Sequence, residues 1–315
     1  MTEMQIYLNN IGELAKLDGL QTAVALGRFD AMHLGHIEII KKAVEYARES
    51  GIKALVYMFS NNPIEVITGR KITSVNSLEK RISILESLGV DIVAAQEFDS
   101  EIMNMTCEDF ADKYLKELFG AKFVAAGYNY SFGSGGSGDI NVLKKLCTDR
   151  DIRLCTVSEV TVGGNQVSST IIRNRIADGD VSGAAELMGR YHSVSGTVIR
   201  GNGIGGSVLG FPTANIALPT ECVLPKFGVY ISRTHLGEGV YNSITNIGGK
   251  PTVDDKSSLI ETYIDGKFKE LYGESIEVEL CEYIRGIMKF ENKEALMAQL
   301  EKDKLKMKEY FKTEE

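Results

Sequence analysis

Apolar runs and amphipathic stretches alternate along the first half of the chain. Five runs have the length and continuous apolar character of buried strands. Each of the first four is followed by a stretch whose apolar residues recur every three or four positions, the spacing of one helix face. This alternation predicts a parallel sheet covered by helices. The expected strands are 23–26, 53–59, 91–95, 122–126 and 152–157, and the expected helices are 33–47, 77–88, 107–119 and 140–148.

The second half has a different pattern. Short runs typical of strands are separated by clusters of Gly, Asn, Asp and Pro, which predicts a small antiparallel barrel. A charged amphipathic helix at 293–311 would close one side of it. Between the halves, a helical linker is expected, broken by Gly179 and Gly183. We therefore divide the chain into a domain at 1–175, a linker helix at 176–190 and a domain at 191–315. The expected barrel strands are 193–200, 228–234, 240–247, 259–264 and 275–283.

Composition narrows the class of protein. A length of 315 residues suits two domains, because a domain has about 150 residues. The net charge is −8, which argues against a nucleic-acid binder. Five scattered cysteines without a C-x-x-C pair are typical of reduced thiols in a cytosolic protein. No apolar run approaches the roughly 18 residues of a membrane helix, and no secretory signal is recognised. We expect a soluble, cytoplasmic protein.

The first candidate site follows the first expected strand. A polar turn after Gly27 leads to His33, Gly35 and His36 at the start of a helical pattern. Gly35 lets the backbone approach a ligand closely, and unpaired N–H groups at a helix N-terminus favour phosphate. Imidazoles there can donate hydrogen bonds to the oxygens of a phosphorus atom undergoing substitution, where negative charge grows in the transition state. The spacing therefore predicts a nucleotide-transfer site beyond the carboxyl ends of the strands.

These residues carry a resemblance to a known family. The segment 27–36 resembles the G-x-F-D-G-x-H-x-G-H signature of the bifunctional bacterial riboflavin kinase/FMN adenylyltransferase (FAD synthetase) family. Segment 127–138 is similar to the family's G-x-D/N-F-x-F-G-x-x-x-x-G, and segment 167–173 to its I-S-S-T-x-I-R. The resemblance implies a Rossmann-like nucleotidyltransferase domain. It implies ATP contacts at Gly27, Phe29, Asp30, His33, His36, Asn129, Ser168, Ser169, Thr170 and Arg173, and flavin contacts at Asn62, Tyr130 and Phe132.

The second half resembles the riboflavin kinase part of the same family. Segment 196–215 is similar to its G-x-V-x-x-G…G-F-P-T-A-N, and segment 260–264 to its V-E-x-H-I. The resemblance implies a riboflavin kinase-like β-barrel in which Glu261 is the catalytic base. It also implies that Thr213 and Asn215 bind Mg²⁺, for which hydroxyl and amide oxygens are suitable ligands. The implied ATP contacts of this domain are Gly201, Gly205, Gly206, Gly210, Pro212 and Thr213.

The functional hypothesis is the synthesis of FAD. Riboflavin would be phosphorylated by ATP to FMN, and FMN would be adenylylated by ATP to FAD and pyrophosphate, with His33, His36 and Glu261 as the catalytic residues. Departures from the family patterns at Asn62, Gly206/Ser207 and Tyr263 keep two alternatives open. One is a single retained activity, foremost FMN adenylylation with a weakened kinase domain. The other is a non-catalytic flavin-binding regulator. We expect small-molecule partners only, no nucleic acid or membrane, and a monomer or weak homo-oligomer.

Overall fold

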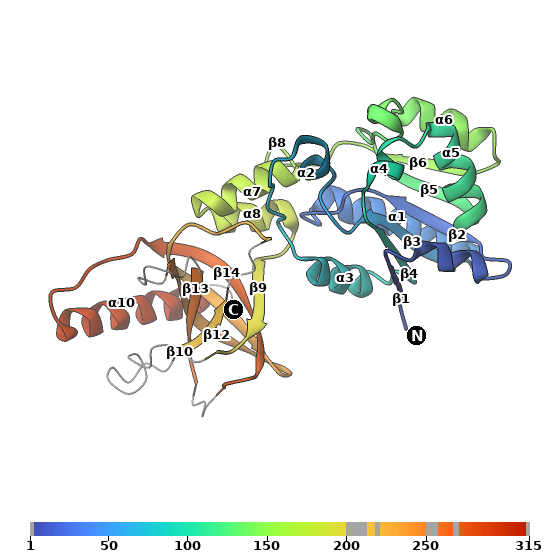
Figure 1. Cartoon of the computed structure of the whole chain (residues 1–315). Helices are drawn as coiled ribbons and strands as arrows, with labels where there is room; N and C mark the ends of the chain where they lie inside the picture. Colours follow the sequence, from blue (N-terminus) through green and yellow to red (C-terminus); the bar gives the residue numbers. More distant parts are fainter. Residues whose placement is uncertain (1–2, 200–212, 218–220, 250–257, 267–270, 313–315) are drawn as a thin grey trace. The chain divides into compact units, whose positions relative to one another are not determined.

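The computed structural model describes residues 3–199, 213–217, 221–249, 258–266 and 271–312 (Figure 1). The chain divides into two compact units, residues 1–169 and 170–315.

The first unit is built on a six-stranded parallel sheet in the order β1-β4-β3-β2-β5-β6. The order reverses between β2 and β5, the point at which ligands of such sheets bind. The five expected strands are confirmed, and β1 is an additional short edge strand that the pattern did not reveal. The strands are β1 (Gln5–Leu8), β2 (Thr22–Leu26), β3 (Lys53–Phe59), β4 (Ile92–Gln96), β5 (Ala121–Gly127) and β6 (Arg153–Val157).

Both faces of this sheet are buried, which explains the continuous apolar runs. In β2, Val24 and Leu26 face one core and Ala23 and Ala25 face the other. Helix α1 (Leu34–Ser50) covers the alanine side, and α6 (Ile140–Thr148) packs on the opposite side. Helix α3 (Leu78–Ser87) also lies on the alanine side.

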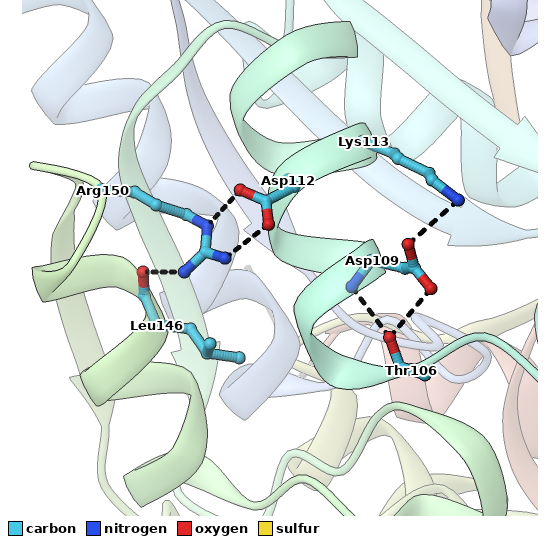
Figure 2. A network of polar contacts seen from close by, with 6 residues as sticks. All are labelled: Thr106, Asp109, Asp112, Lys113, Leu146 and Arg150. Atoms are coloured by element: carbon cyan, nitrogen blue, oxygen red, sulfur yellow. Dashed lines mark hydrogen bonds and ion pairs between the residues drawn. The ribbon is translucent and has the colours of Figure 1, made fainter.

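The expected helix at 107–119 is only partly confirmed. A single turn, α5 (Cys107–Asp109), runs directly into a π-helix, Phe110–Leu118. Arg150, which follows α6, clamps this helix: its Nε and Nη2 donate to the Asp112 carboxylate at 2.8 and 2.7 Å, and its Nη1 donates to the carbonyl of Leu146 at 3.0 Å (Figure 2). The guanidinium holds the pKa of Asp112 below its usual value. The wider turn of the helix is thus fixed to its neighbour.

Short elements join these parts. Helix α2 (Pro63–Thr68) follows β3, and α4 (Ser100–Met103) follows β4. A hairpin of β7 (Thr161–Val162) and β8 (Asn165–Gln166) follows β6, and 3-10 turns occupy Ile11–Lys16 and Ser134–Gly136.

The second unit begins with two helices rather than one broken linker. They are α7 (Ser169–Asp178) and α8 (Val181–Met188). The break at Gly179 is confirmed, with φ +88°. The expected break at Gly183 is wrong, because Gly183 lies inside α8, where its N–H donates to the capping Asp180 carboxylate at 3.0 Å. Val181 packs into the barrel core, so α8 is part of this unit's core.

The barrel is an antiparallel sheet in the order β10-β13-β12-β11-β14-β9. An isolated bridge between Ile199 and Asn215, with a backbone hydrogen bond of 2.8 Å, brings its two ends together. The small antiparallel barrel is thereby confirmed. The strands are β9 (His192–Thr197), β10 (Thr213–Ala217), β11 (Gly228–Leu236), β12 (Gly239–Gly249), β13 (Ser258–Ile264) and β14 (Ser275–Arg285).

The barrel interior combines an apolar cluster with a row of buried hydroxyls. Ser232 Oγ lies 2.8 Å from Ser243 Oγ and 2.7 Å from Thr245 Oγ1. Thr245 Oγ1 continues to Thr262 Oγ1 at 3.0 Å, and Thr234 Oγ1 donates to Ser243 Oγ at 2.9 Å. All five side chains are fully buried. This hydroxyl row crosses three neighbouring strands, β11, β12 and β13, and satisfies its own hydrogen bonds.

The closing helix is confirmed as α10 (Lys293–Lys312), which packs Met307 and Phe311 on the outer face of the barrel. Its Asp303 has no exposed area and accepts hydrogen bonds from Arg285 Nη2 at 2.7 Å and Gln299 Nε2 at 2.8 Å. The helix is thus held to β14 by a buried ion pair.

We expect Asp303→Ala to destabilise the second unit by about 3–5 kcal/mol, because it leaves the Arg285 charge without its buried partner. Urea unfolding of the full chain, followed by far-ultraviolet circular dichroism, measures the loss. Glu301→Ala, two residues away on the exposed side of α10, is the control and should change the free energy of unfolding by less than about 0.5 kcal/mol. Equal effects of the two substitutions would contradict the importance of the ion pair.

Candidate functional site

The two histidines of the first unit meet at the start of α1. His33 is the N-cap residue, and its Nδ1 accepts a hydrogen bond from the backbone N–H of His36 at 3.2 Å. The two rings stack with their centroids 3.6 Å apart and an interplanar angle of 17°. Because Nδ1 of His33 is an acceptor, the neutral ring carries its proton on Nε2. The Nε2–H group is therefore the hydrogen-bond donor of the neutral His33 ring.

A strained loop places these rings. Phe29 and Met32 both adopt a left-handed backbone with φ 48°, and both side chains are fully buried. Such conformations cost about 1–3 kcal/mol each and persist where the surroundings enforce them. The Phe29 ring meets His36 edge-on at 5.3 Å. A side chain at Gly27 would lie 2.8 Å from the Phe29 ring, so only glycine fits there.

Asp30 completes the support of this loop. It is buried, and its Oδ1 accepts the backbone N–H of Val75 at 2.7 Å, while its carbonyl accepts Asn76 Nδ2 at 2.8 Å. Gly27, Phe29 and Asp30 therefore lie with the histidines, and in this structure their side chains and backbone hold the loop in shape.

The predicted flavin contacts lie beyond the carboxyl ends of β3 and β5. Asn62 follows β3, and its Oδ1 caps α2 by accepting from Ile64 N at 3.1 Å and also accepts Arg28 Nη2 at 2.8 Å. Tyr130 stacks on Phe132 with centroids 5.8 Å apart. Burial raises the pKa of the Tyr130 hydroxyl. Asn129 lies in the same loop with its side chain exposed.

An aromatic cluster beside this loop escaped the sequence analysis. Phe110 lies 5.5 Å from Phe132 and 5.9 Å from Tyr57, measured between ring centroids. Gln96 connects Tyr57 and Tyr114 through two hydrogen bonds of 3.1 Å. Apart from Phe132 in the loop itself, these residues come from β3, β4 and the π-helix. The only feature of the sequence that could have indicated this cluster is the spacing of aromatic residues along 110–119. An amphipathic helix accounts for that spacing by itself, so it did not point to a ligand site.

The predicted serine-threonine motif runs across the boundary between the units. Ser168 and Ser169 end the first unit, and Thr170 and Arg173 belong to the second. The motif forms the start of α7, with Thr170 exposed and Arg173 half-buried. Val167, just before it, donates its N–H to the Val160 carbonyl at 3.1 Å. This hydrogen bond joins the segment that leads into α7 to the residue that precedes the β7–β8 hairpin.

In the barrel, strand pairing brings the predicted kinase residues together. Asn215 on β10 pairs directly with Glu261 on β13, and Thr213 pairs with Tyr263. On its other side Glu261 pairs with Asn246 on β12. Burial raises the pKa of the Glu261 carboxyl, and a hydrogen bond from the Asn246 side chain partly offsets this. The predicted Gly201, Gly205, Gly206, Gly210 and Pro212 lie outside the described residues.

The side chain of Asn215 suits a hard cation. It is 6% exposed, and its Nδ2 is directed to the Thr213 carbonyl at 3.4 Å. Among the described residues, its buried Oδ1 has no hydrogen-bond partner. A buried oxygen without a donor is costly unless something else satisfies it, and Mg²⁺ prefers oxygen ligands of this kind.

Comparisons with known proteins agree with both halves of the chain. Residues 16–171 match the family model described as FAD synthetase, and residues 188–311 match the one described as riboflavin kinase. The fold and the two matched family models thus define a two-domain flavin-nucleotide synthase. Curated relatives called bifunctional riboflavin kinase/FMN adenylyltransferase occur in Listeria monocytogenes (33% identical, covering 97% of this chain and 98% of the relative) and Bacillus subtilis (32% identical, with the same coverage). The chain belongs to the bifunctional riboflavin kinase/FMN adenylyltransferase family.

A solved structure supports the same overall fold. A crystal structure described as a macrolide-efflux protein from Streptococcus pneumoniae is 27% identical and superposes with a TM-score of 0.86, covering 97% of this chain and 98% of that one. The description as a macrolide-efflux protein applies to that protein alone. Among the described residues, no helix is both long enough and apolar enough to cross a membrane.

Proposed function

We propose that this chain makes FAD from riboflavin in two ATP-dependent steps, one in each domain. The barrel transfers the γ-phosphoryl group of ATP to the terminal hydroxyl of riboflavin and releases FMN and ADP. The first domain then joins FMN to the adenylyl group of a second ATP and releases pyrophosphate. The observation that carries the proposal is that both family models match, side by side, on one chain.

In the adenylylation step, a phosphate oxygen of FMN attacks the α-phosphorus of ATP, and the bond from that phosphorus to the bridging oxygen of pyrophosphate breaks. His33 and His36 donate hydrogen bonds to the α-phosphate as negative charge grows there. Their stacking and the capped helix start support this role, since they are held together before substrate binds. The proposed ATP contacts are these two rings with Gly27, Phe29, Asp30, Asn129, Ser168, Ser169, Thr170 and Arg173. The proposed flavin contacts are Asn62, Tyr130 and Phe132.

In the kinase step, Glu261 accepts the proton of the riboflavin hydroxyl while the hydroxyl oxygen attacks the γ-phosphorus. The raised pKa of Glu261 supports this role, because a base works best when its pKa approaches the working pH. Thr213 and Asn215 would hold Mg²⁺, which when bound balances the charge of the phosphates. Gly201, Gly205, Gly206, Gly210, Pro212 and Thr213 are the proposed ATP contacts of this domain.

Several further properties belong to the proposal. The domains extend over 1–175 and 191–315 with helical residues 176–190 between them. The chain works in the cytoplasm on riboflavin, FMN and ATP, as a monomer or weak homo-oligomer, without nucleic-acid or membrane partners.

One assay separates the possible activities. The full chain is supplied with riboflavin, ATP and Mg²⁺, and FMN is resolved from FAD by chromatography. Formation of both supports the proposal. FAD formed only from added FMN, or FMN formed without FAD, indicates a single retained activity. Bound flavin with no consumption of ATP indicates a regulator.

We expect Asn215→Ala to raise the Mg²⁺ concentration for half-maximal FMN formation about tenfold or more, a loss typical of altered metal sites. The Mg²⁺ dependence of FAD formation from FMN, measured on the same variant, should not change. Asn242→Ala, on an exposed position of β12, controls for general effects on the barrel. An unchanged Mg²⁺ requirement for FMN formation would remove Asn215 from the metal site.

A further inference from the structure

Glu261 lies in a row of three polar side chains that crosses three strands. Its direct partners are Asn215 on β10 and Asn246 on β12. Residues that pair directly on neighbouring antiparallel strands point to the same face of a sheet. Residues next to Glu261 and Asn246 in sequence, Thr262 and Thr245, point into the barrel interior. The outer polar row, Asn215–Glu261–Asn246, therefore lies on the outer face.

The two amides of the outer polar row form different hydrogen bonds. Asn246 stands directly opposite Glu261 in the register of β12 and β13, and a hydrogen bond from its side chain lowers the pKa of the Glu261 carboxyl against the raising effect of burial. An ionised carboxylate only accepts hydrogen bonds, so the Asn246 amide nitrogen is the donor. Asn215 instead directs its nitrogen to the Thr213 carbonyl. Of the two flanking amides, Asn246 is thus the one that donates to the carboxylate.

A half-buried glutamate needs such a partner. Its side chain has three rotatable torsions, and partial burial favours rotation of the charged group toward water. Asn246 has only two torsions and stands on a strand whose register is fixed from the inside, where Thr245 meets Thr262 at 3.0 Å. The donor is therefore held more rigidly than the carboxylate that it contacts.

We propose that Asn246 is a positioning residue for riboflavin phosphorylation. Its amide N–H holds one oxygen of the Glu261 carboxylate, and the second oxygen is left to accept the proton of the substrate hydroxyl. This inference rests on the proposed role of Glu261 as the base. In this role Asn246 acts through Glu261, without touching the reacting atoms itself.

The test compares two substitutions at Asn246 in the full chain. Asn246→Leu keeps the side-chain volume and removes the donor, and Asn246→Gln keeps the amide. With saturating Mg²⁺, we expect Asn246→Leu to lower kcat for FMN formation by about tenfold or more, the size of a lost hydrogen bond to a charged group. KM for riboflavin and for ATP should stay within about twofold, since only the reacting step is affected. Asn246→Gln should retain more than about a third of the activity.

Two controls accompany these variants. Asn242→Leu changes an exposed asparagine on the same strand and should leave both activities unchanged. FAD formation from FMN should be unchanged in every variant. If Asn246→Leu does not fold by circular dichroism, Asn246→Ala replaces it with the same expectation.

Three results would overturn the inference: a wild-type kcat in the variant without the donor, a rise in KM alone, or an equal loss in Asn246→Gln.

A combined variant separates the inference from its premise, the role of Glu261 as the base. If Asn246 acts through Glu261, adding Asn246→Leu to Glu261→Gln lowers kcat no further. If Glu261→Gln alone keeps full kinase activity, the proposed base is wrong. If the combined variant is slower than Glu261→Gln, Asn246 acts by another route.

Discussion

Replacing Glu261 by glutamine is expected to lower kcat for riboflavin phosphorylation about 10²–10⁴-fold, the usual contribution of a general base. Glutamine keeps the size of the side chain but cannot accept the proton of the attacking hydroxyl. FAD formation from added FMN should remain at the wild-type rate, because that reaction belongs to the other domain. Chromatographic separation of FMN and FAD, with each substrate supplied in turn, measures both rates on one preparation.

The matched control for this substitution is Glu282→Gln. Glu282 is an exposed glutamate on β14 of the same barrel, and its loss should leave both rates unchanged. Kinase activity that survives in Glu261→Gln would show that the proton leaves by another route. Loss of both activities in a folded variant would show that the two reactions do not divide between the domains as we propose.

The second large effect is expected at the histidine pair. His36→Ala should lower FAD formation from FMN about 10²–10³-fold, as removal of one donor to a developing anion does. Riboflavin phosphorylation should be unaffected. His36 is the better choice for this test, because His33 also caps α1, and loss of a cap costs about 1 kcal/mol of stability in its own right.

Lys42→Ala is the control for helix α1, since the Lys42 side chain is 40% exposed and, among the contacts described, its ion pairs join it only to Glu38 and Glu45 on the same helix. Both activities should be unchanged in it. FAD formation that persists in His36→Ala would restrict the role of the stacked pair to the structure of the helix start.

Much of the first domain could be predicted because its strands are buried on both faces. A strand such as β3 then appears as an unbroken apolar run, and its bounds, Lys53–Phe59, coincide with the predicted range. Helix α6, Ile140–Thr148, was likewise predicted over its full length, and in the structure Asp139 caps its start. In contrast, β1 has only four residues and lies at the sheet edge with mostly exposed side chains, and so short an apolar run does not distinguish a strand from a loop.

The geometry of the sites depended on contacts that no local pattern encodes. The left-handed backbone of Phe29 and Met32 arises from the packing around the loop, whereas their residue types disfavour it. The π-helix likewise looks like an ordinary amphipathic helix in sequence. Motif resemblance could name Glu261 and Asn215, but only the strand register makes them neighbours.

The same dependence on register is the reason Asn246 was missed. It is separated from Glu261 by 15 positions in sequence and belongs to no motif that we recognised. Its significance appears only when β12 and β13 are paired.

The hydroxyl row inside the barrel helps to fix the register of β12 and β13. If β13 slipped by one residue against β12, Thr262 would turn outward and Glu261 would enter the interior. Thr245 would lose its neighbour at 3.0 Å, and a charged group would face hydroxyls that are already bonded to one another. An all-aliphatic interior would discriminate less sharply between the two alignments, because dispersion contacts have little directionality. The buried hydroxyls can therefore select the correct strand register during folding. Only in that register do Asn215, Glu261 and Asn246 lie together on the outer face of the barrel.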